Sequence, residues 1–508
     1  MKPHLLFFLL SFYCTQMNAQ QVSLSLEDKK MDAYLMAHEP ATLTIQIKNL
    51  PDTVKKVPIT YTLVQLGVGT QTTRYAEMDK TGIAKIVFDQ NFPNQQAWLS
   101  VGDYLYAGVY LNDGLTVSID VSKLPKDGGY MIGEGIVYSG LDGNLNTVMN
   151  KNVLFKKTER NALTNRLTAV SRARRNFTAD AFAIKIDSIR KAIEALEDEF
   201  IASNKNYSWA VKNESLSEIY GSIAVSYWGD VMPAELFKEV SAHQPMFTSN
   251  DGAGFYNYLN IYTRNMKSGK EAKTLISNLA LLDSLYTPQK SAILKLVSLD
   301  SEKDVFSKSY SIIINSIQTQ WTKKLANNEL IKANNNQKRI DNLLANSTKI
   351  ESITIGTPLS KLAFDAELFQ IKELKSVDDF MLNLKQKFPN KALIIDFWAT
   401  WCGPCLSDLP NSKKLHEANK DLPVAYVYLC TSSGSTIELW KQKVANLQIP
   451  GTHIFVEDKI VSQLKEMLNA STGFPAYVVM DVNGKVNSKV ITHMGYLNRE
   501  SLKKVIGL

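Results

Sequence analysis

Short runs of alternating apolar and polar residues follow one another through the N-terminal part of the chain. Clear examples are Ala41 to Ile47 and Ile83 to Phe88, and turn signals such as Asn112-Asp113-Gly114 separate the runs. A period of two residues places one side of each strand in a core and the other side in solvent. Regular short strands of this kind predict a β-sandwich over residues 20–125.

The pattern changes to helical spacing over residues 126–345. One amphipathic helix is marked by the apolar residues Ile184, Ile186, Ile189, Ile193, Leu196 and Phe200. Intervals of three and four residues gather side chains on one face of a helix. Similar spacing recurs over residues 216–228, 253–262, 272–285 and 305–330. We therefore expect an all-helical middle region, in which no repeat period stands out.

Two features of this middle region resemble binding sites. The aromatic residues Phe255, Tyr256, Tyr258 and Tyr262 follow one another closely, but such spacing on a helix is more typical of a core than of a groove. His243 has no second His or Cys at metal-ligand spacing. Neither feature predicts a functional site, and no metal site is expected.

Strands and helices alternate over residues 346–508. Leu393 to Ala399 is apolar except for Asp396, as expected of a strand buried on both faces of a sheet. Helices and strands then alternate, and two strands, 476–481 and 485–492, flank the hairpin signal Asn483-Gly484. This order predicts an α/β domain, although its first strand is not evident in the sequence.

Length and charge add limits to this multidomain layout. At 508 residues the chain exceeds what one hydrophobic core serves. Its net charge of +7 comes without a run of Lys or Arg, so no nucleic acid partner is expected. No segment after the leader approaches the ~20 apolar residues of a transmembrane helix.

The first 19 residues have the pattern of a secretory signal peptide. Lys2 precedes an apolar run from Leu5 to Tyr13, and polar residues lead to Ala19. This pattern predicts an exported, periplasmic protein. Lipid attachment at Cys14 is the alternative, but Phe12 and Tyr13 are bulky where a lipoprotein signal requires small residues.

Cys402 and Cys405 lie where the buried strand gives way to a helix. The positive end of a helix dipole favours a thiolate, and in Cys-x-x-Cys motifs the pKa of the first thiol falls from about 8.5 to as low as ~3.5. Neither a second cysteine pair nor a His pair is present to complete a zinc site. The arrangement predicts a thioredoxin-like redox domain, in which Cys430 is interpreted as a buried, inert thiol.

The segment Asp396 to Cys405 reads Asp-Phe-Trp-Ala-Thr-Trp-Cys-Gly-Pro-Cys, and Pro410 follows it. It resembles the thioredoxin active-site segment. The helix insertion between Cys430 and Gly473-Phe474-Pro475 is similar to that of the exported TlpA/ResA-like thiol-disulfide oxidoreductases. The resemblance is specific for roughly the last 150 residues and only architectural for the rest.

The resemblance implies a role for each of these residues. Cys402, as the exposed sulfur, would attack a substrate disulfide, and Cys405 would resolve the mixed disulfide. Asp396 matches a buried carboxylate that exchanges a proton with Cys405. Asp408 matches an acid of the ResA-like group, although a carboxylate in the first turn also stabilises a helix, so both interpretations stay open.

The resemblance also implies a substrate surface formed by Trp401, Gly403, Pro404, Phe474 and Pro475. Pro475 matches the family's cis-proline, and Phe474 is bulkier than the small or β-branched residue usual before it. No cofactor is implied beyond the redox-active cysteine pair.

Taken together, these expectations describe an exported thiol-disulfide oxidoreductase that acts on protein disulfides. The Gly-Pro dipeptide and Asp396 favour a reductase, supplied with electrons by a membrane donor protein. A disulfide isomerase or oxidase is the alternative within the class. A binding protein that recruits envelope components, with an accessory redox domain, is the alternative from another class.

Overall fold

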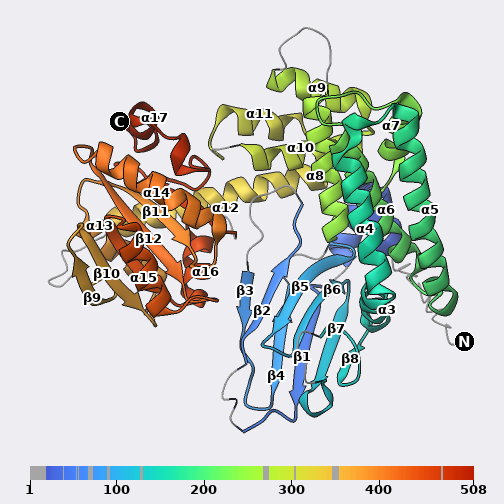
Figure 1. Ribbon diagram of the computed structural model, residues 1–508, viewed down its shortest axis with the longest axis horizontal. Coiled ribbons are helices and arrows are strands. Elements are labelled where there is room, and N and C mark those ends of the chain that lie inside the picture. The colour runs from blue at the N-terminus through green and yellow to red at the C-terminus, as the bar shows by residue number, and fades with distance from the viewer. Residues whose placement is uncertain are drawn as a thin grey trace, which may run out of the picture.

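The computed structural model describes residues 19–508 except 38, 53, 55–56, 67–72, 89–91, 126–129, 267–273, 303–304, 346–353 and 471–472. Residues 1–18 of the predicted leader, including Cys14, lie outside the described residues. Figure 1 shows three parts: a β-sheet region, a bundle of helices and a mixed sheet near the C-terminus. No helix in the described ranges is long and apolar enough to cross a membrane.

Two four-stranded sheets with the orders β4-β1-β7-β8 and β3-β2-β5-β6 form the β-sheet region. The strands are β1 Thr42–Lys48, β2 Ile59–Leu63, β3 Thr73–Ala76, β4 Ile83–Val87, β5 Gln95–Val101, β6 Leu105–Leu111, β7 Gly114–Asp120 and β8 Ile136–Ser139. Inward residues of both sheets, among them Ile45, Leu99 and Val117, share one hydrophobic core. The sheets therefore pack face to face, as the alternating pattern predicts.

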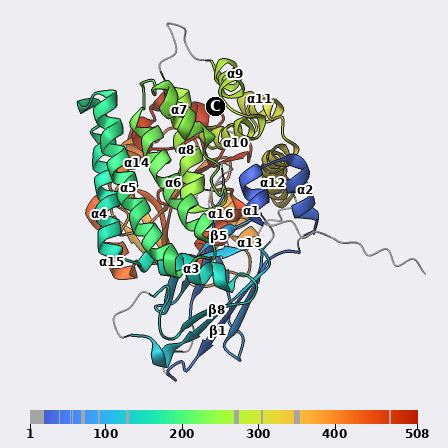
Figure 2. The ribbon, with the colours of Figure 1, turned by 90° about the vertical axis from the view of Figure 1, so that its right-hand side faces the viewer.

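The N-terminal end of this region differs from the sequence prediction. Residues assigned to the sandwich from position 20 instead form the helices α1 (Ala19–Ser25) and α2 (Asp28–Ala37). Met31 and Tyr34 are buried in the core of the helical region, and Trp321 Nε1 donates a 3.2 Å hydrogen bond to the Leu26 carbonyl. Figure 2 shows α2 beside α12. Long-range packing, which local pattern does not reveal, decides this segment.

Helices form the middle part of the chain. They are α3 Gly143–Leu154, α4 Lys157–Arg172, α5 Ala179–Ser203, α6 Ser208–Ser226, α7 Ala234–Ala242, α8 Asn250–Asn265, α9 Leu275–Leu285, α10 Pro288–Ser298, α11 Lys308–Ser316 and α12 Gln320–Ala345. The predicted apolar face of α5 is buried except for Ile184, which is 70% exposed. Phe255, Tyr256 and Tyr262 belong to the core, and His243 is hydrogen-bonded to Ser217 at 2.9 Å. These residues stabilise the bundle.

A seven-stranded mixed sheet with the order β15-β14-β11-β12-β13-β10-β9 forms the C-terminal part. Its strands are β9 Thr357–Leu362, β10 Ala366–Ile371, β11 Ala392–Trp398, β12 Val424–Thr431, β13 Gly451–Val456, β14 Ala476–Met480 and β15 Val486–Asn487. Its helices are α13 Val377–Lys387, α14 Gly403–Ala418, α15 Ile437–Leu447, α16 Asp458–Met467 and α17 Arg499–Val505. Hydrophobic clusters cover both faces of the sheet, with β11 and β12 fully buried between them.

Two details of this sheet differ from the sequence prediction. The antiparallel pair β9 and β10 supplies the entry strands that the sequence does not make evident. The strand expected over residues 485–492 is limited to the two residues of β15. Because β15 pairs only with the end of β14, at Val479 and Met480, little of the predicted hairpin forms.

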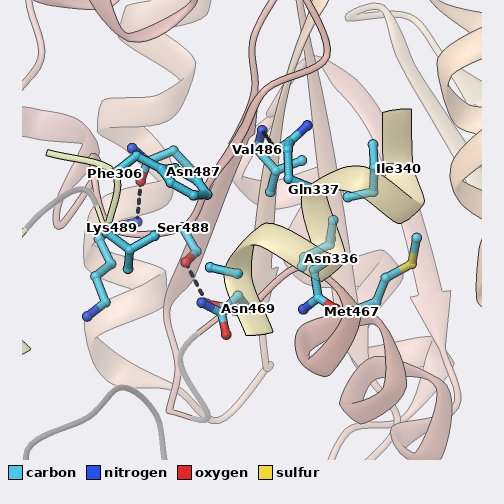
Figure 3. A pocket seen from close by; sticks show the side chains of 13 residues that line it. Phe306, Asn336, Gln337, Ile340, Met467, Asn469, Val486, Asn487, Ser488 and Lys489 are labelled. Carbon is cyan, nitrogen blue, oxygen red and sulfur yellow. Dashed lines mark hydrogen bonds between the residues drawn. The ribbon is translucent and has the colours of Figure 1, made fainter. Parts of the chain in front are cut away.

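The C-terminal part contacts the other two parts through α12 and α16. Figure 1 shows α12 running from the helical bundle to the mixed sheet, where Gln337 accepts a 2.8 Å hydrogen bond from the Val486 backbone. At the other side, the Tyr75 hydroxyl of β3 donates to Asp458, the first residue of α16. A cavity of about 30 Å³ remains between α12 and β15 (Figure 3), with room for one or two water molecules.

Candidate active site

Cys402 and Cys405 are joined by a disulfide with an S–S distance of 2.05 Å. Strand β11 leads directly to this pair, and Cys402 is the N-cap residue of α14. Its sulfur accepts a 3.1 Å hydrogen bond from the Cys405 backbone N–H. The first N–H groups of a helix have no intrahelical acceptor, so they stabilise negative charge on the capping sulfur.

Both sulfur-bearing residues lie just below the surface. Cys402 is 4% exposed and Cys405 2% exposed, whereas the preceding Trp401 is 57% exposed. The expectation that Cys402 is exposed is therefore wrong for the disulfide form. The bond to Cys405 directs the Cys402 sulfur back toward the helix, into the apolar cluster that contains both cysteines. Gly403 and Pro404, between them, are exposed.

Trp401 contacts the loop that precedes β14. Its indole Nε1 donates a 2.7 Å hydrogen bond to the Ser433 carbonyl, after β12. The Phe474 ring meets the indole in an edge-to-face arrangement with a centroid distance of 5.9 Å. The peptide bond between Phe474 and Pro475 is cis, as the resemblance implies. The expected surface residues from both segments therefore lie together beside the cysteine pair.

Asp396 is buried in the middle of β11, between Tyr428 of β12 and Tyr477 of β14. Burial, followed by repulsion from Asp408, raises the pKa of its carboxyl well above the usual range, while Lys465 opposes this shift. One carboxyl oxygen, Oδ1, has no hydrogen-bond partner among the described residues. A buried carboxyl with a raised pKa stays protonated to higher pH than a solvated one and is a candidate for proton exchange.

Asp408 lies one turn after Cys405 on α14 and is 1% exposed. Its carboxyl oxygens are surrounded by donors: Tyr477 Oη at 2.6 Å, Met494 N at 2.7 Å, Asn411 Nδ2 at 3.1 Å and Gly495 N at 3.3 Å. An ionised carboxylate, which only accepts, matches this set of donors.

The position of Asp408 in the helix also differs from the expectation. It lies in the second turn of α14, beyond the first turn where a carboxylate benefits most from the helix dipole. The contacts instead tie α14 to β14 and to the segment Met494–Tyr496. The geometry favours an anchoring role for this carboxylate.

Lys465 of α16 belongs to the site and is missed by sequence reasoning. It is 4% exposed, and its ammonium donates a 3.0 Å hydrogen bond to the Gly473 carbonyl. The same ammonium lies 3.6 Å from the centroid of the Phe474 ring. Burial lowers the pKa of Lys465 to about 7, although Asp458 and Asp396 oppose the shift. One feature of the sequence indicates its burial: Lys465 follows Val461 by four residues and therefore lies on the apolar face of the helix.

Cys430 is the penultimate residue of β12 and lies opposite Trp398 of β11. It is fully buried and, within the described part of the chain, forms no disulfide. Burial raises the pKa of its thiol. A buried thiol with a raised pKa is a poor nucleophile, which agrees with the interpretation of Cys430 as inert.

Comparison with known proteins places this site in a recognised domain. Residues 366–506 match the Redoxin family model. A stretch of 65 residues is 38% identical to mitochondrial thioredoxin-3 of Saccharomyces cerevisiae and covers 13% of this chain and 49% of that protein. A stretch of 33 residues is 54% identical to putative thioredoxin 2 of Streptomyces coelicolor and covers 6% of this chain and 25% of that protein. The chain thus spans half or less of the curated relatives that it matches.

Solved structures give similar matches. The thioredoxin domain of a thiol-disulfide oxidoreductase from Bacteroides vulgatus is 22% identical with a TM-score of 0.20, covering 24% of this chain and 80% of that one. A thiol:disulfide interchange protein from Chlorobium tepidum is 18% identical with a TM-score of 0.20, covering 24% of this chain and 82% of that one. The family match identifies residues 366–506 as a Redoxin domain.

Proposed function

We propose that this protein is an exported thiol-disulfide oxidoreductase that reduces protein disulfides by cycling Cys402 and Cys405 between dithiol and disulfide. The observation that carries the proposal is the Cys402–Cys405 disulfide at the start of α14. The helix N-terminus stabilises the Cys402 thiolate, which is the attacking species in thiol-disulfide exchange. The Redoxin match over the same region supports the assignment.

The reaction has two exchange steps. The Cys402 thiolate attacks one sulfur of a substrate disulfide, which breaks that bond, releases the other sulfur as a thiolate and leaves a mixed disulfide. Cys405 then transfers its thiol proton to the Asp396 carboxylate and attacks the Cys402 sulfur. The mixed disulfide breaks, the second substrate sulfur leaves, and two electrons have passed from the protein to the substrate.

The substrate lies against Trp401, Gly403, Pro404, Phe474 and Pro475. The exposure of Trp401 and the contact between Trp401 and Phe474 support this surface, because they offer a firm apolar edge beside the sulfurs. Phe474 leaves less room at this edge than a small residue, so an extended, unfolded substrate segment fits better than a compact one.

The direction of electron flow depends on reduction potential. The Gly-Pro dipeptide between the cysteines and the buried Asp396 support a reductase. In an oxidising compartment a reductase requires an electron donor, for which we propose a membrane protein that carries a dithiol. The leader pattern of residues 1–19 supports export.

Turnover on a protein disulfide tests the proposal. With insulin as substrate and dithiothreitol as electron source, Cys402→Ser abolishes turnover. After removal of dithiothreitol, Cys405→Ser accumulates a mixed disulfide on Cys402. Cys430→Ala, which removes a buried thiol that takes no part in the disulfide, keeps turnover. Retained turnover in Cys402→Ser contradicts the proposal. Equilibration with glutathione buffers then measures the reduction potential of the cysteine pair. It distinguishes a thioredoxin-like value of about −270 mV from an oxidase-like value of about −120 mV.

A recruiting role for the N-terminal parts is the second candidate. Trp98 and Tyr106 stack on one another at 5.8 Å on the sandwich, and Tyr106 is 54% exposed. Exposed aromatic pairs of this kind are typical of partner surfaces. Replacement of both by Ala in the full-length Cys405→Ser chain tests the role. Loss of trapped clients with unchanged reactivity toward a small disulfide supports recruitment, and unchanged trapping contradicts it.

A further inference from the structure

Helix α16 carries a buried lysine toward the redox site. Its apolar residues Ile460, Val461, Leu464 and Met467 pack into the core on one face of the sheet. Lys465 lies among them with an exposed fraction of 4%. Lysine is rarely buried to this extent unless its ammonium has partners, so the contacts of Lys465 define what it does.

The ammonium of Lys465 holds the loop that precedes Pro475. It donates to the Gly473 carbonyl at 3.0 Å and lies 3.6 Å from the centre of the Phe474 ring. A cation over an aromatic face is attractive, and the attraction increases when water is excluded. Phe474 in turn contacts Trp401, the residue before Cys402. Lys465 thus fixes the surface proposed to receive the substrate.

The same ammonium interacts electrostatically with Asp396. Its positive charge lowers the pKa of the Asp396 carboxyl, against the effects of burial and of Asp408 on α14. In return, Asp396 of β11 and Asp458 of α16 raise the pKa of Lys465 against its own burial. The remaining titratable groups that interact with Asp396 are Tyr477 of β14 and Tyr428 and Cys430 of β12.

We propose that Lys465 is a positioning residue of the redox site, whose buried ammonium holds Phe474 and the backbone before Pro475 in place for the substrate and supports proton transfer at Asp396. This inference rests on the proposed function. In the resolving step the proton passes from the Cys405 thiol to the Asp396 carboxylate, and the Cys405 sulfur displaces the substrate sulfur from Cys402. The nearby cation increases the fraction of Asp396 that is a carboxylate and therefore able to accept that proton.

The test compares Lys465→Met, Lys465→Gln and Lys459→Met in the full-length protein. Lys459 is the matched control because it lies on the same helix but is exposed and paired with Glu77 at 2.6 Å. The readouts are the pH dependence of insulin reduction, with kcat and KM, and the titration of Asp396 followed by 13C NMR of labelled aspartate. Melting temperatures establish that each variant is folded.

Lys465→Met is expected to raise the apparent pKa of Asp396 by about one unit or more, to lower kcat at neutral pH and to raise KM. Lys465→Gln keeps a donor for Gly473 without the charge, so it shifts the titration as strongly but raises KM less. Lys459→Met retains the wild-type profile. In an Asp396→Asn background, Lys465→Met produces no further change in the pH profile.

Two outcomes overturn the inference. In the first, the folded Lys465 variants show the wild-type Asp396 titration and KM. In the second, the shift in pH profile persists in the Asp396→Asn background. Failure of the proposed function looks different, because wild type and Cys402→Ser then reduce insulin equally slowly while the NMR titration still reports on Lys465 and Asp396.

Discussion

The hydroxyl of Tyr477 donates a 2.6 Å hydrogen bond to Oδ2 of Asp408 in the interior of the redox domain. Tyr477 belongs to β14 and Asp408 to α14, so the bond joins the sheet to the helix that begins at the cysteine pair. Burial and the charges of Asp396 and Asp408 raise the pKa of Tyr477, which keeps its phenol protonated as a donor. The contact fixes the position of α14 relative to Asp396, the neighbour of Tyr477 on β11.

Tyr477→Phe is expected to lower the free energy of unfolding by about 1–3 kcal/mol, because a buried carboxylate loses a charge-assisted hydrogen bond. Denaturant unfolding measures the change. Tyr426→Phe is the matched control, since the buried Tyr426 hydroxyl has no hydrogen-bond partner among the described residues. Its removal costs little stability. Equal losses in the two variants contradict the anchoring role of Asp408.

Asp408→Asn separates anchoring from proton handling. The variant keeps the shape of the side chain, but it replaces one carboxylate oxygen of the parent protein with an NH₂ group. That group then faces hydrogen-bond donors. If Asp408 is an anchor, the variant loses about 2–4 kcal/mol of stability, and the pH midpoints of its turnover equal those of the parent protein. Unfolding by denaturant and the pH profile of insulin reduction measure the two effects. A displaced midpoint in a folded variant supports proton handling instead.

The sequence predicts those structural features that are determined by residues close together in the chain. The apolar run around Asp396 and the spacing of Cys402 and Cys405 define a strand, a corner and a capping thiol within ten positions, and the structure has each of them. The cis bond at Pro475 follows from the resemblance of that segment to a known family. These features need no knowledge of distant contacts.

The parts that the sequence misses depend on tertiary packing. Residues 19–37 become helices because Met31 and Tyr34 complete a core built mainly from residues far along the chain. Lys465 is buried because a ring and a carbonyl from the next loop receive its ammonium. Cys402 is buried because its sulfur is bonded to Cys405 within an apolar cluster formed by several elements. No periodicity within one segment contains this information.

Asp396→Asn is expected to stabilise the oxidised protein above about pH 4, by about 1.4 kcal/mol for each unit of pKa displacement that it removes. The pKa of Asp396 is raised in the folded state, so the folded protein binds more protons than the unfolded chain. The contribution of this residue to stability therefore falls as pH rises from about 4 through its folded-state pKa.

Urea unfolding of Asp396→Asn and its parent at pH 4, 7 and 9 measures this difference. Lys465, with a pKa lowered to about 7, acts in the opposite sense, since its contribution to stability rises between pH 7 and its unfolded value near 10.5. The difference between the two proteins at each pH removes most of that background. A gap that closes as pH rises from 4 to 7 contradicts the prediction.

Gly434→Ala is expected to disturb the substrate surface without touching a cysteine. Gly434 has a φ of +62°, and a Cβ at this position would lie 2.8 Å from Nε1 of Trp401. The added methyl group displaces the indole, which breaks its 2.7 Å hydrogen bond to Ser433 and its contact with Phe474. We expect a loss of about 1–2 kcal/mol in stability and a several-fold rise in KM for a protein disulfide.

Gly254→Ala provides the control for this last substitution. Gly254 lies inside α8, and a Cβ there would meet no atom within 4 Å among the described residues. Alanine favours a helix over glycine by about 1 kcal/mol, so this variant gains stability and keeps its KM. Steady-state kinetics at a temperature where both variants are folded separates the surface effect from stability. A wild-type KM in Gly434→Ala means that the position of Trp401 does not matter for substrate binding.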